Sequence, residues 1–195
     1  MKDWNTVIAE TYRAYEQIEF KPKGTLTKDD RYPFADGIIK EVFNIKNHDI
    51  SEIYKKVVLL NSLYSTNIFA TFEVSLKISK IRNFVDRVEE GDLTLVEEIR
   101  HNVISGKKKD FYSFSTKYCH HSNPRKYPIY DSFVEKMLIE HQLPDNISKK
   151  EYKNRNKEYP YFKNEIDTLG RKWKLDIDLY YAKLDKFLWI SGKNL

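Results

Sequence analysis

Residues 111–138 carry the side chains whose types and spacing best suit chemistry. Asp131 stands alone at the start of a run with helical apolar spacing, formed by Val134, Met137 and Leu138. A carboxylate at the head of a helix accepts hydrogen bonds from the first backbone N–H groups, and capping alone accounts for an aspartate there. The same carboxylate can also face a cationic intermediate or position a water molecule. Capping alone is therefore an adequate interpretation of Asp131, and a catalytic role for its carboxylate stays open beside it.

Three cations precede this carboxylate in the same stretch, at Lys117, Arg125 and Lys126. If they fold beside Asp131, they stabilise its negative charge. If they do not, their side chains are available to bind phosphate. Both alternatives keep this stretch at the centre of any functional interpretation.

A second candidate precedes this stretch, where a helix predicted to end at Ile104 is followed by Ser105, Gly106 and three lysines. A short glycine-containing hairpin between two helices presents backbone N–H groups to a phosphate. Lys107, Lys108 and Lys109 would add an attraction for polyanions that weakens with salt. The alternative is a solvated basic loop, which is the usual role of a run of charges.

The cysteine and histidines of this stretch favour neither a metal site nor a cysteine nucleophile. His120 and His121 are adjacent, so on a helix their side chains point about 100° apart. Cys119 is the only cysteine, and with the two histidines it makes no recognised ligand spacing. Glycine-rich phosphate loops and zinc-protease or serine-hydrolase motifs do not occur. The sequence therefore predicts no metal and no cofactor.

Helical periodicity accounts for nearly all of the apolar pattern, and no alternation of period two is sustained. The sequence predicts an all-α protein of eight to ten short helices. Gly91 should end one of these helices, and Asp49 and Thr94 should each begin one with a capping box. Asp176 should cap the last helix and Gly192 should end it. Val85 and Val103 should lie on the inner faces of their helices. The predicted helices lie at about 3–18, from 36, from 49, at 70–88, 94–104, from 111, from 131, at 162–173 and at 176–192, with one short helix in the basic interval after 144.

Composition and length indicate the number of domains, the kind of partner and the cellular compartment. The 195 residues are 41% apolar with a net charge of +5, which suits one domain spanning residues 1–195 and slightly favours a polyanionic partner. A single cysteine excludes an internal disulfide and fits a cytoplasmic location. No run of about 18 apolar residues occurs, so no membrane span is expected. The oligomeric state does not follow from the sequence.

Three short segments resemble the helix–hairpin–helix DNA glycosylase superfamily, of the endonuclease III and 8-oxoguanine glycosylase type. VVLLNSLYSTN (57–67) is similar to an early helix whose polar end intrudes into DNA. ISGKKKDFYSF (104–114) occupies the place of the family's hairpin, and YPIYDSFV (127–134) is similar to the segment that contains its catalytic aspartate. The resemblance covers about residues 50–140. SFSTKYCHHSNPRKYPIYD also resembles uncharacterised bacterial proteins of this kind.

The resemblance implies a site for excising a damaged base from DNA. Asp131 would be the catalytic aspartate, stabilising an oxocarbenium-like sugar and activating a water. Tyr64 and Asn67 would fill the gap left by a flipped nucleotide, and the hairpin would grip a phosphate. No lysine falls squarely at the family's nucleophile position, since Lys109 comes early and Lys117 late. The resemblance thus implies a monofunctional enzyme, with Lys117 as a candidate for Schiff-base chemistry.

Two other functions remain open from the sequence. A non-catalytic nucleic-acid binder would keep the scaffold and use only its basic surface, which comprises the hairpin lysines, Lys149, Lys150, Lys153 and Arg155. A helical interaction protein would bind no nucleic acid at all. Asp131→Asn separates the enzyme from the binder, and loss of salt-sensitive DNA affinity on replacing the hairpin lysines separates both from the third function.

Overall fold

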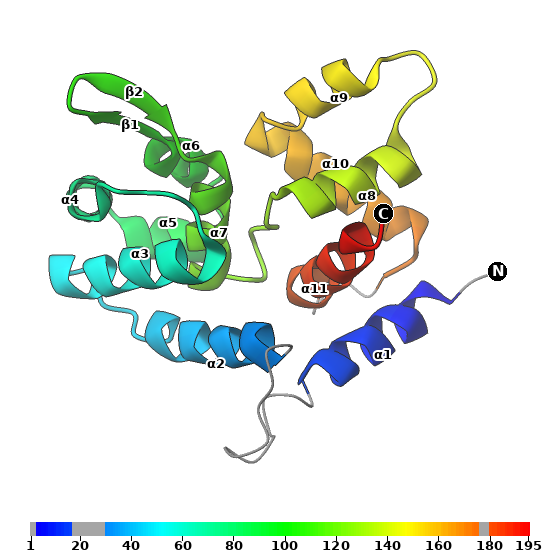
Figure 1. Cartoon of the computed structure of the whole chain (residues 1–195), viewed down its shortest axis with the longest axis horizontal. Helices are drawn as coiled ribbons and strands as arrows, with labels where there is room; N and C mark the ends of the chain where they lie inside the picture. Colours follow the sequence, from blue (N-terminus) through cyan, green and yellow to red (C-terminus); the bar gives the residue numbers. More distant parts are fainter. Residues whose placement is uncertain (1–2, 17–29, 176–179) are drawn as a thin grey trace.

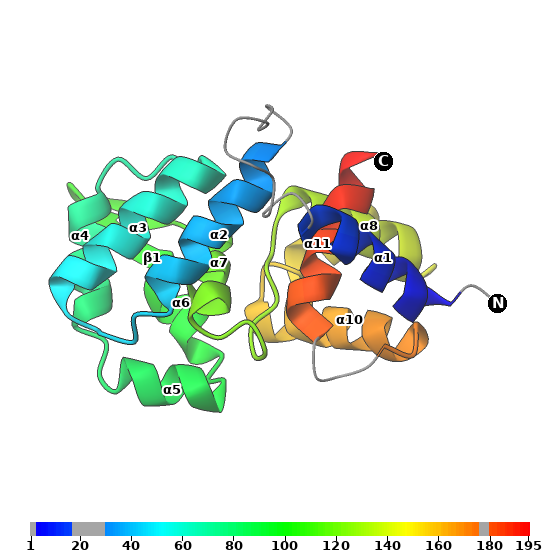
Figure 2. The same cartoon turned by 90° about the horizontal axis from the view of Figure 1, so that it is seen from below.

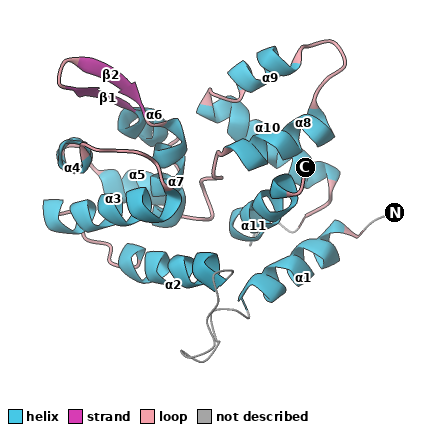
Figure 3. Ribbon diagram, viewed as in Figure 1, coloured by secondary structure: helices cyan, strands magenta, loops and turns pink. Residues whose placement is uncertain are grey.

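The computed structural model describes residues 3–16, 30–175 and 180–195, and these ranges are predominantly helical, as predicted (Figure 3). They contain eleven helices and one two-stranded antiparallel hairpin. The elements in chain order are α1 (Trp4–Glu16), α2 (Arg31–Phe43), α3 (Ile50–Tyr64), α4 (Thr71–Ser79), α5 (Phe84–Glu90), α6 (Thr94–Arg100), β1 (His101–Ile104), β2 (Lys107–Asp110), α7 (Tyr112–Ser122), α8 (Ser132–Gln142), α9 (Lys149–Arg155), α10 (Tyr159–Lys172) and α11 (Tyr180–Lys193).

The elements form two groups, which Figures 1 and 2 show side by side. The first group holds α2 to α7 and the hairpin, and the second holds α8 to α11. Residues 123–131 carry the chain from one group to the other. Helix α1 packs on α11 in the second group, where the Trp4 ring stacks on Trp173 at 4.3 Å between centroids. The N-terminal helix therefore belongs structurally with the C-terminal helices.

Local capping fixes several helix starts, as the sequence predicted. Asp131 Oδ1 accepts from the backbone N–H groups of Phe133 and Val134, both at 2.9 Å. Asp49 Oδ1 accepts from Glu52 N at 2.9 Å, which forms one half of the predicted capping box. The expected cap at Thr94 is wrong, because Thr94 is already helical. The carboxylate of Asp92 accepts from its N–H instead.

The helix predicted at 70–88 is two helices, α4 and α5. Asn83 has φ +52° and ψ +33°, and asparagine is one of the few residues that enter this left-handed region readily. The apolar periodicity runs across the break because Ile78 and Val88 are both buried in the same core. Val85, which was expected to face inward, is 37% exposed. The predicted end at Gly91 is confirmed, with φ +82°.

The helix predicted at 94–104 ends at Arg100, and the following residues form a β-hairpin. Ile104 pairs with Lys107, leaving Ser105 and Gly106 as a two-residue turn with φ +50° and +73°. Two successive positive φ values match the right-handed twist of a hairpin. Glycine adopts a positive φ without strain because it has no Cβ atom. Val103, expected on an inner helix face, is 70% exposed on β1. The segment is therefore helix, β-hairpin, helix.

Other predicted boundaries shift modestly. Helix α2 begins at Arg31 instead of Asp36, and the short helix expected after residue 144 is α9. The predicted cap at Asp176 lies outside the described residues. Gly192 was expected to stop the last helix, but it lies within α11. A glycine is needed there for a different reason, which concerns packing.

Gly192→Ala should destabilise the protein by about 1–3 kcal/mol, as overpacking of a tight contact does. A Cβ atom at Gly192 would clash with the Phe133 carbonyl oxygen, and a backbone oxygen moves only if α8 and α11 separate. Urea unfolding measures the change, with the exposed neighbour substitution Lys193→Ala as the control. Equal free energies of unfolding for the two variants would show that α8 and α11 accommodate the added methyl group without loss of stability.

Candidate functional site

Lys117 occupies the middle of α7, a helix buried along most of its length. Its side chain is among the buried polar groups, at 4% exposure. Nζ donates to Ser113 Oγ at 2.6 Å and lies 5.1 Å from the centre of the Tyr64 ring. Burial lowers the pKa of Lys117, although the neighbouring Asp131 and Asp185 oppose the effect. An amine in this setting is closer to its neutral, nucleophilic form than a surface lysine.

Asp131 lies next to Lys117 at the start of α8. The two side chains line one small cavity of about 50 Å³, together with Tyr64. Both capping bonds use Oδ1, so within the described part of the chain Oδ2 has no hydrogen-bond partner. Asp131 is half-buried, and its second oxygen remains available for chemistry. The structure thus brings together three of the residues that the sequence singled out, from α3, α7 and α8.

Three residues missed by the sequence analysis complete this cluster: Asp36 on α2, and Asp185 and Lys186 on α11. Lys186 Nζ lies 2.6 Å from Asp36 Oδ2 and 3.9 Å from Asp185 Oδ2. Tyr15 OH donates to Asp36 at 2.6 Å. The sequence held one signal, since the charged pair 185–186 interrupts a stretch of buried apolar residues in α11. Adjacent charges within such a stretch suggest a polar site inside a core.

The cluster holds two carboxyl groups of different character. Burial raises the pKa of Asp185 to about 7, with Asp131 and Asp36 adding to the effect and Lys186 and Lys117 opposing it. Burial alone would favour loss of the proton from Lys186, but Asp36 and Asp185 outweigh it and raise the pKa of Lys186. Near pH 7 the cluster therefore contains a firmly charged ammonium beside a carboxyl that exchanges its proton.

Asp185→Asn should gain stability relative to the wild type as the pH rises from about 4 to about 7. In that window the unfolded Asp185 releases its proton while the folded one retains it, so the wild-type carboxyl destabilises the fold progressively. Across the whole window, the free energy of unfolding of the variant relative to the wild type should rise by an amount of the order of 4 kcal/mol. Urea unfolding of both proteins at pH 4.5 and pH 7.5 measures it. A difference that does not change with pH would contradict the assignment.

The hairpin residues do not join this cluster. Ser105, Gly106 and the three lysines line neither cavity around the cluster, and the hairpin tip points away from α8 in Figure 1. Lys107, Lys108 and Lys109 are exposed and make no ion pair within the described ranges. Asp110, near the family's nucleophile position, is bonded to Arg100. Any phosphate contact of the hairpin is therefore remote from Asp131.

Tyr64 and Asn67 have different environments. Tyr64 is half-buried, with its hydroxyl 3.0 Å from His121 Nε2, whereas Asn67 is exposed with φ +56°. Phe69 is 98% exposed in the same loop, which the sequence analysis overlooked. The loop is ordered by Asn61, whose side chain bonds both the N–H and the carbonyl of Ile68.

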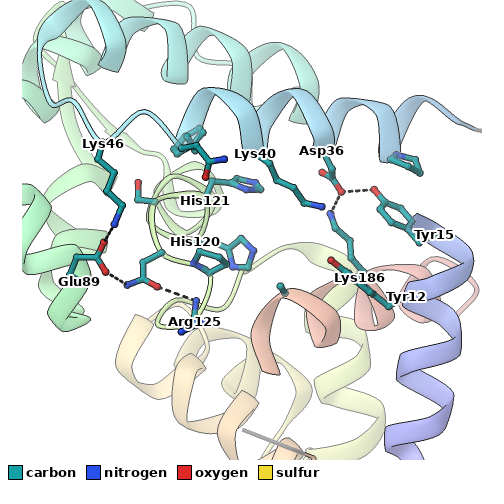
Figure 4. A pocket seen from close by; sticks show the side chains of 17 residues that line it. Tyr12, Tyr15, Asp36, Lys40, Lys46, Glu89, His120, His121, Arg125 and Lys186 are labelled. Carbon is teal, nitrogen blue, oxygen red and sulfur yellow. Dashed lines mark hydrogen bonds and ion pairs between the residues drawn. The ribbon is translucent and has the colours of Figure 1, made fainter. Parts of the chain in front are cut away.

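Arg125 lies apart from the small cluster, at the edge of a larger cavity of about 550 Å³ (Figure 4). This cavity shares Tyr15, Asp36 and Lys186 with the small one but contains neither Lys117 nor Asp131. His120 and His121 form part of its wall. Throughout the described ranges, no group of three histidine, cysteine or acidic residues is placed to hold a metal ion. None of the helices described there is long and apolar enough to cross a membrane.

Comparison with known proteins assigns the family. The family model HI_0787_N, described as an N-terminal domain, matches residues 13–126. An uncharacterised protein of Haemophilus influenzae is 38% identical over 148 residues, which cover 74% of this chain and 72% of that protein. The chain therefore belongs to the HI_0787_N family. No solved structure matches it. The matched range contains Lys117 and Arg125 and ends before Asp131.

Proposed function

We propose that this protein is a DNA-binding N-glycosylase, with Asp131 as its catalytic carboxylate. The observation that carries the proposal is the shared cavity of Lys117 and Asp131, which come from α7 and α8 and meet where the two helix groups adjoin. A buried amine beside a carboxylate with one unoccupied oxygen suits reactions at a sugar carbon that becomes cationic. We propose the fold as a distant variant of the helix–hairpin–helix glycosylases, in which a β-hairpin replaces the usual loop.

The roles follow from the contacts of each group. Asp131 Oδ1 is held by the helix N–H groups, which fixes the direction of Oδ2. Oδ2 would face the oxocarbenium-like sugar and orient the attacking water. Lys117 is the candidate nucleophile for an aldehyde, because burial favours its neutral form. The damaged nucleotide would have to leave the duplex to reach them, at a cost of about a few kcal/mol in stacking.

The proposal is tested on DNA pools treated separately with an alkylating agent, an oxidant or nitrous acid. The wild type should generate new abasic sites in at least one pool, detected with an aldehyde-reactive probe. Borohydride should trap a covalent complex with abasic DNA if Lys117 attacks the sugar, and Lys117→Met should abolish that trapping. The absence of new abasic sites in all three pools would refute the glycosylase.

A second candidate is a nucleic-acid binder without catalysis, and the exposed lysines of β2 favour it. Replacing Lys107, Lys108 and Lys109 together with alanine should reduce the slope of log affinity against log salt by roughly 2–3. Each exposed lysine that contacts a phosphate releases about one counterion. Fluorescence anisotropy with a labelled duplex measures the slopes, and the control is Lys136→Ala, which removes an exposed lysine of α8 outside the basic surface named above. An unchanged slope would remove the hairpin from the DNA interface.

A further inference from the structure

The larger cavity has the dimensions of a ligand site in its own right. Its volume of about 550 Å³ falls within the range of roughly 300–1,000 Å³ that small-molecule and cofactor sites occupy. The walls come from α1, α2, α5, α7, α11 and the connections that follow α2 and α7, so both helix groups contribute (Figure 4). Tyr15, Asp36 and Lys186 line both cavities, but Lys117 and Asp131 do not line this one. A ligand can therefore fill it without contacting the two proposed catalytic residues.

Its lining carries an excess of positive charge. Four cations and two carboxylates line the cavity. Lys46 pairs with Glu89 at 2.5 Å and Lys186 pairs with Asp36 at 2.6 Å. Arg125 is exposed, and its guanidinium makes no ion pair with any described residue. Figure 4 shows Lys40 extending from α2 over the same cavity. A planar guanidinium suits a phosphate, which it can bind through two parallel hydrogen bonds.

Another part of the wall carries no charge and offers a hydrogen-bond acceptor in a fixed position, on the ring of His120. His120 Nδ1 lies 2.7 Å from the Tyr127 carbonyl oxygen, which can only accept, so Nδ1 carries the hydrogen. Burial lowers the pKa of His120 to about 4, so the ring is neutral at pH 7. Its Nε2 therefore bears a lone pair. The rings of Tyr12, Tyr15 and Phe43 line the same space and suit a flat partner.

We propose that this cavity binds a nucleoside monophosphate, with the phosphate at Arg125 and a ring N–H directed to His120. A nucleotide is the ligand class that joins an anion to a flat ring with N–H donors at this size. The site needs neither duplex DNA nor Asp131, so it goes beyond the glycosylase function. The nucleotide is either free in solution or the phosphorylated end of a strand, since both present the same chemistry.

The test uses the purified full chain and isothermal titration with the four ribonucleoside and four deoxyribonucleoside monophosphates. At least one should bind about tenfold or more tightly than its nucleoside, than ribose 5-phosphate and than inorganic phosphate. Arg125→Ala should weaken that binding by about tenfold or more, since an exposed arginine can be replaced without harming the fold. Lys80→Ala, which removes an exposed cation outside the cavity and outside the hairpin, should leave the affinity unchanged.

Two further experiments distinguish a free nucleotide from the end of a strand, and the nucleotide site from the proposed glycosylase. Competition by a 5′-phosphorylated oligonucleotide against the mononucleotide identifies a strand end as a second source for the same site. Asp131→Asn should retain nucleotide binding, so loss of base excision in that variant would leave this site intact. Equal binding of phosphate and nucleotide, no saturation by any mononucleotide, or an unchanged affinity in Arg125→Ala would each overturn the assignment.

Discussion

Asp131→Asn should lower the rate of base excision by at least about 100-fold, in the range found when one preorganised electrostatic group is removed from an active site. The same substitution should change the free energy of unfolding by less than about 0.5 kcal/mol, because asparagine caps a helix as well as aspartate does. Both capping bonds use Oδ1, which asparagine retains. Only the charge and the second oxygen are lost. Single-turnover excision and urea unfolding give the two quantities.

Asp131→Ala supplies the comparison. It removes the cap as well as the charge, so it should lose the same activity and in addition about 1 kcal/mol of stability. If Asp131→Asn retained full turnover, the carboxylate would be a cap and nothing more. The nucleic-acid binder would then become the better description of the protein. If both variants lost equal stability, Oδ2 would have a structural role that its contacts do not indicate.

Arg100→Ala should destabilise the protein by about 3 kcal/mol, which is large for one side chain. Its Nε and Nη2 donate to the two oxygens of Asp110 at 2.8 and 2.9 Å, and Nη1 donates to the Lys157 carbonyl at 2.6 Å. The guanidinium also lies 4.3 Å from the centre of the Tyr112 ring. One buried side chain therefore joins the end of α6, the base of the hairpin and the segment between α9 and α10.

Arg155→Ala is the matched control, since Arg155 makes an exposed pair with Glu151 within α9. It should leave the stability nearly unchanged, because exposed ion pairs contribute little. Thermal unfolding followed by circular dichroism compares the two variants. Because Arg100 holds the hairpin, its removal should also increase hydrogen exchange at the amides of β1 and β2. Similar small losses in both variants would mean that water replaces the contacts of Arg100 at little cost.

Helix content and several caps were predictable from the sequence because they depend on residues close together in the chain. Asp131 caps through bonds to residues two and three positions later, so a local pattern suffices. The break at Asn83 was not predictable from periodicity, since α4 and α5 bury their apolar residues in one core. The two strands of the hairpin were missed because each has only four residues and neither carries an apolar alternation, one of them being three lysines and an aspartate.

The candidate site was predictable only in part, for a similar reason. Lys117 and Asp131 lie in one stretch of sequence, and the resemblance pointed to both. Asp36 and Lys186 come from opposite ends of the chain, and only the packing of α2 and α11 on α7 and α8 brings them together. Phe69 has no sequence signal, because an apolar residue in a loop is ordinarily expected to turn inward.

The docking of α1 on α11 has a consequence for synthesis on the ribosome. Trp4 cannot stack on Trp173 or contact Phe187 until these two partners have left the exit tunnel. Tyr12 and Tyr15, which line the larger cavity, lie on the same helix α1. Helix α1 is translated long before α11, so nascent chains must carry it undocked until α11 emerges. The larger cavity forms only then, because Ala182 and Lys186 of α11 also line it.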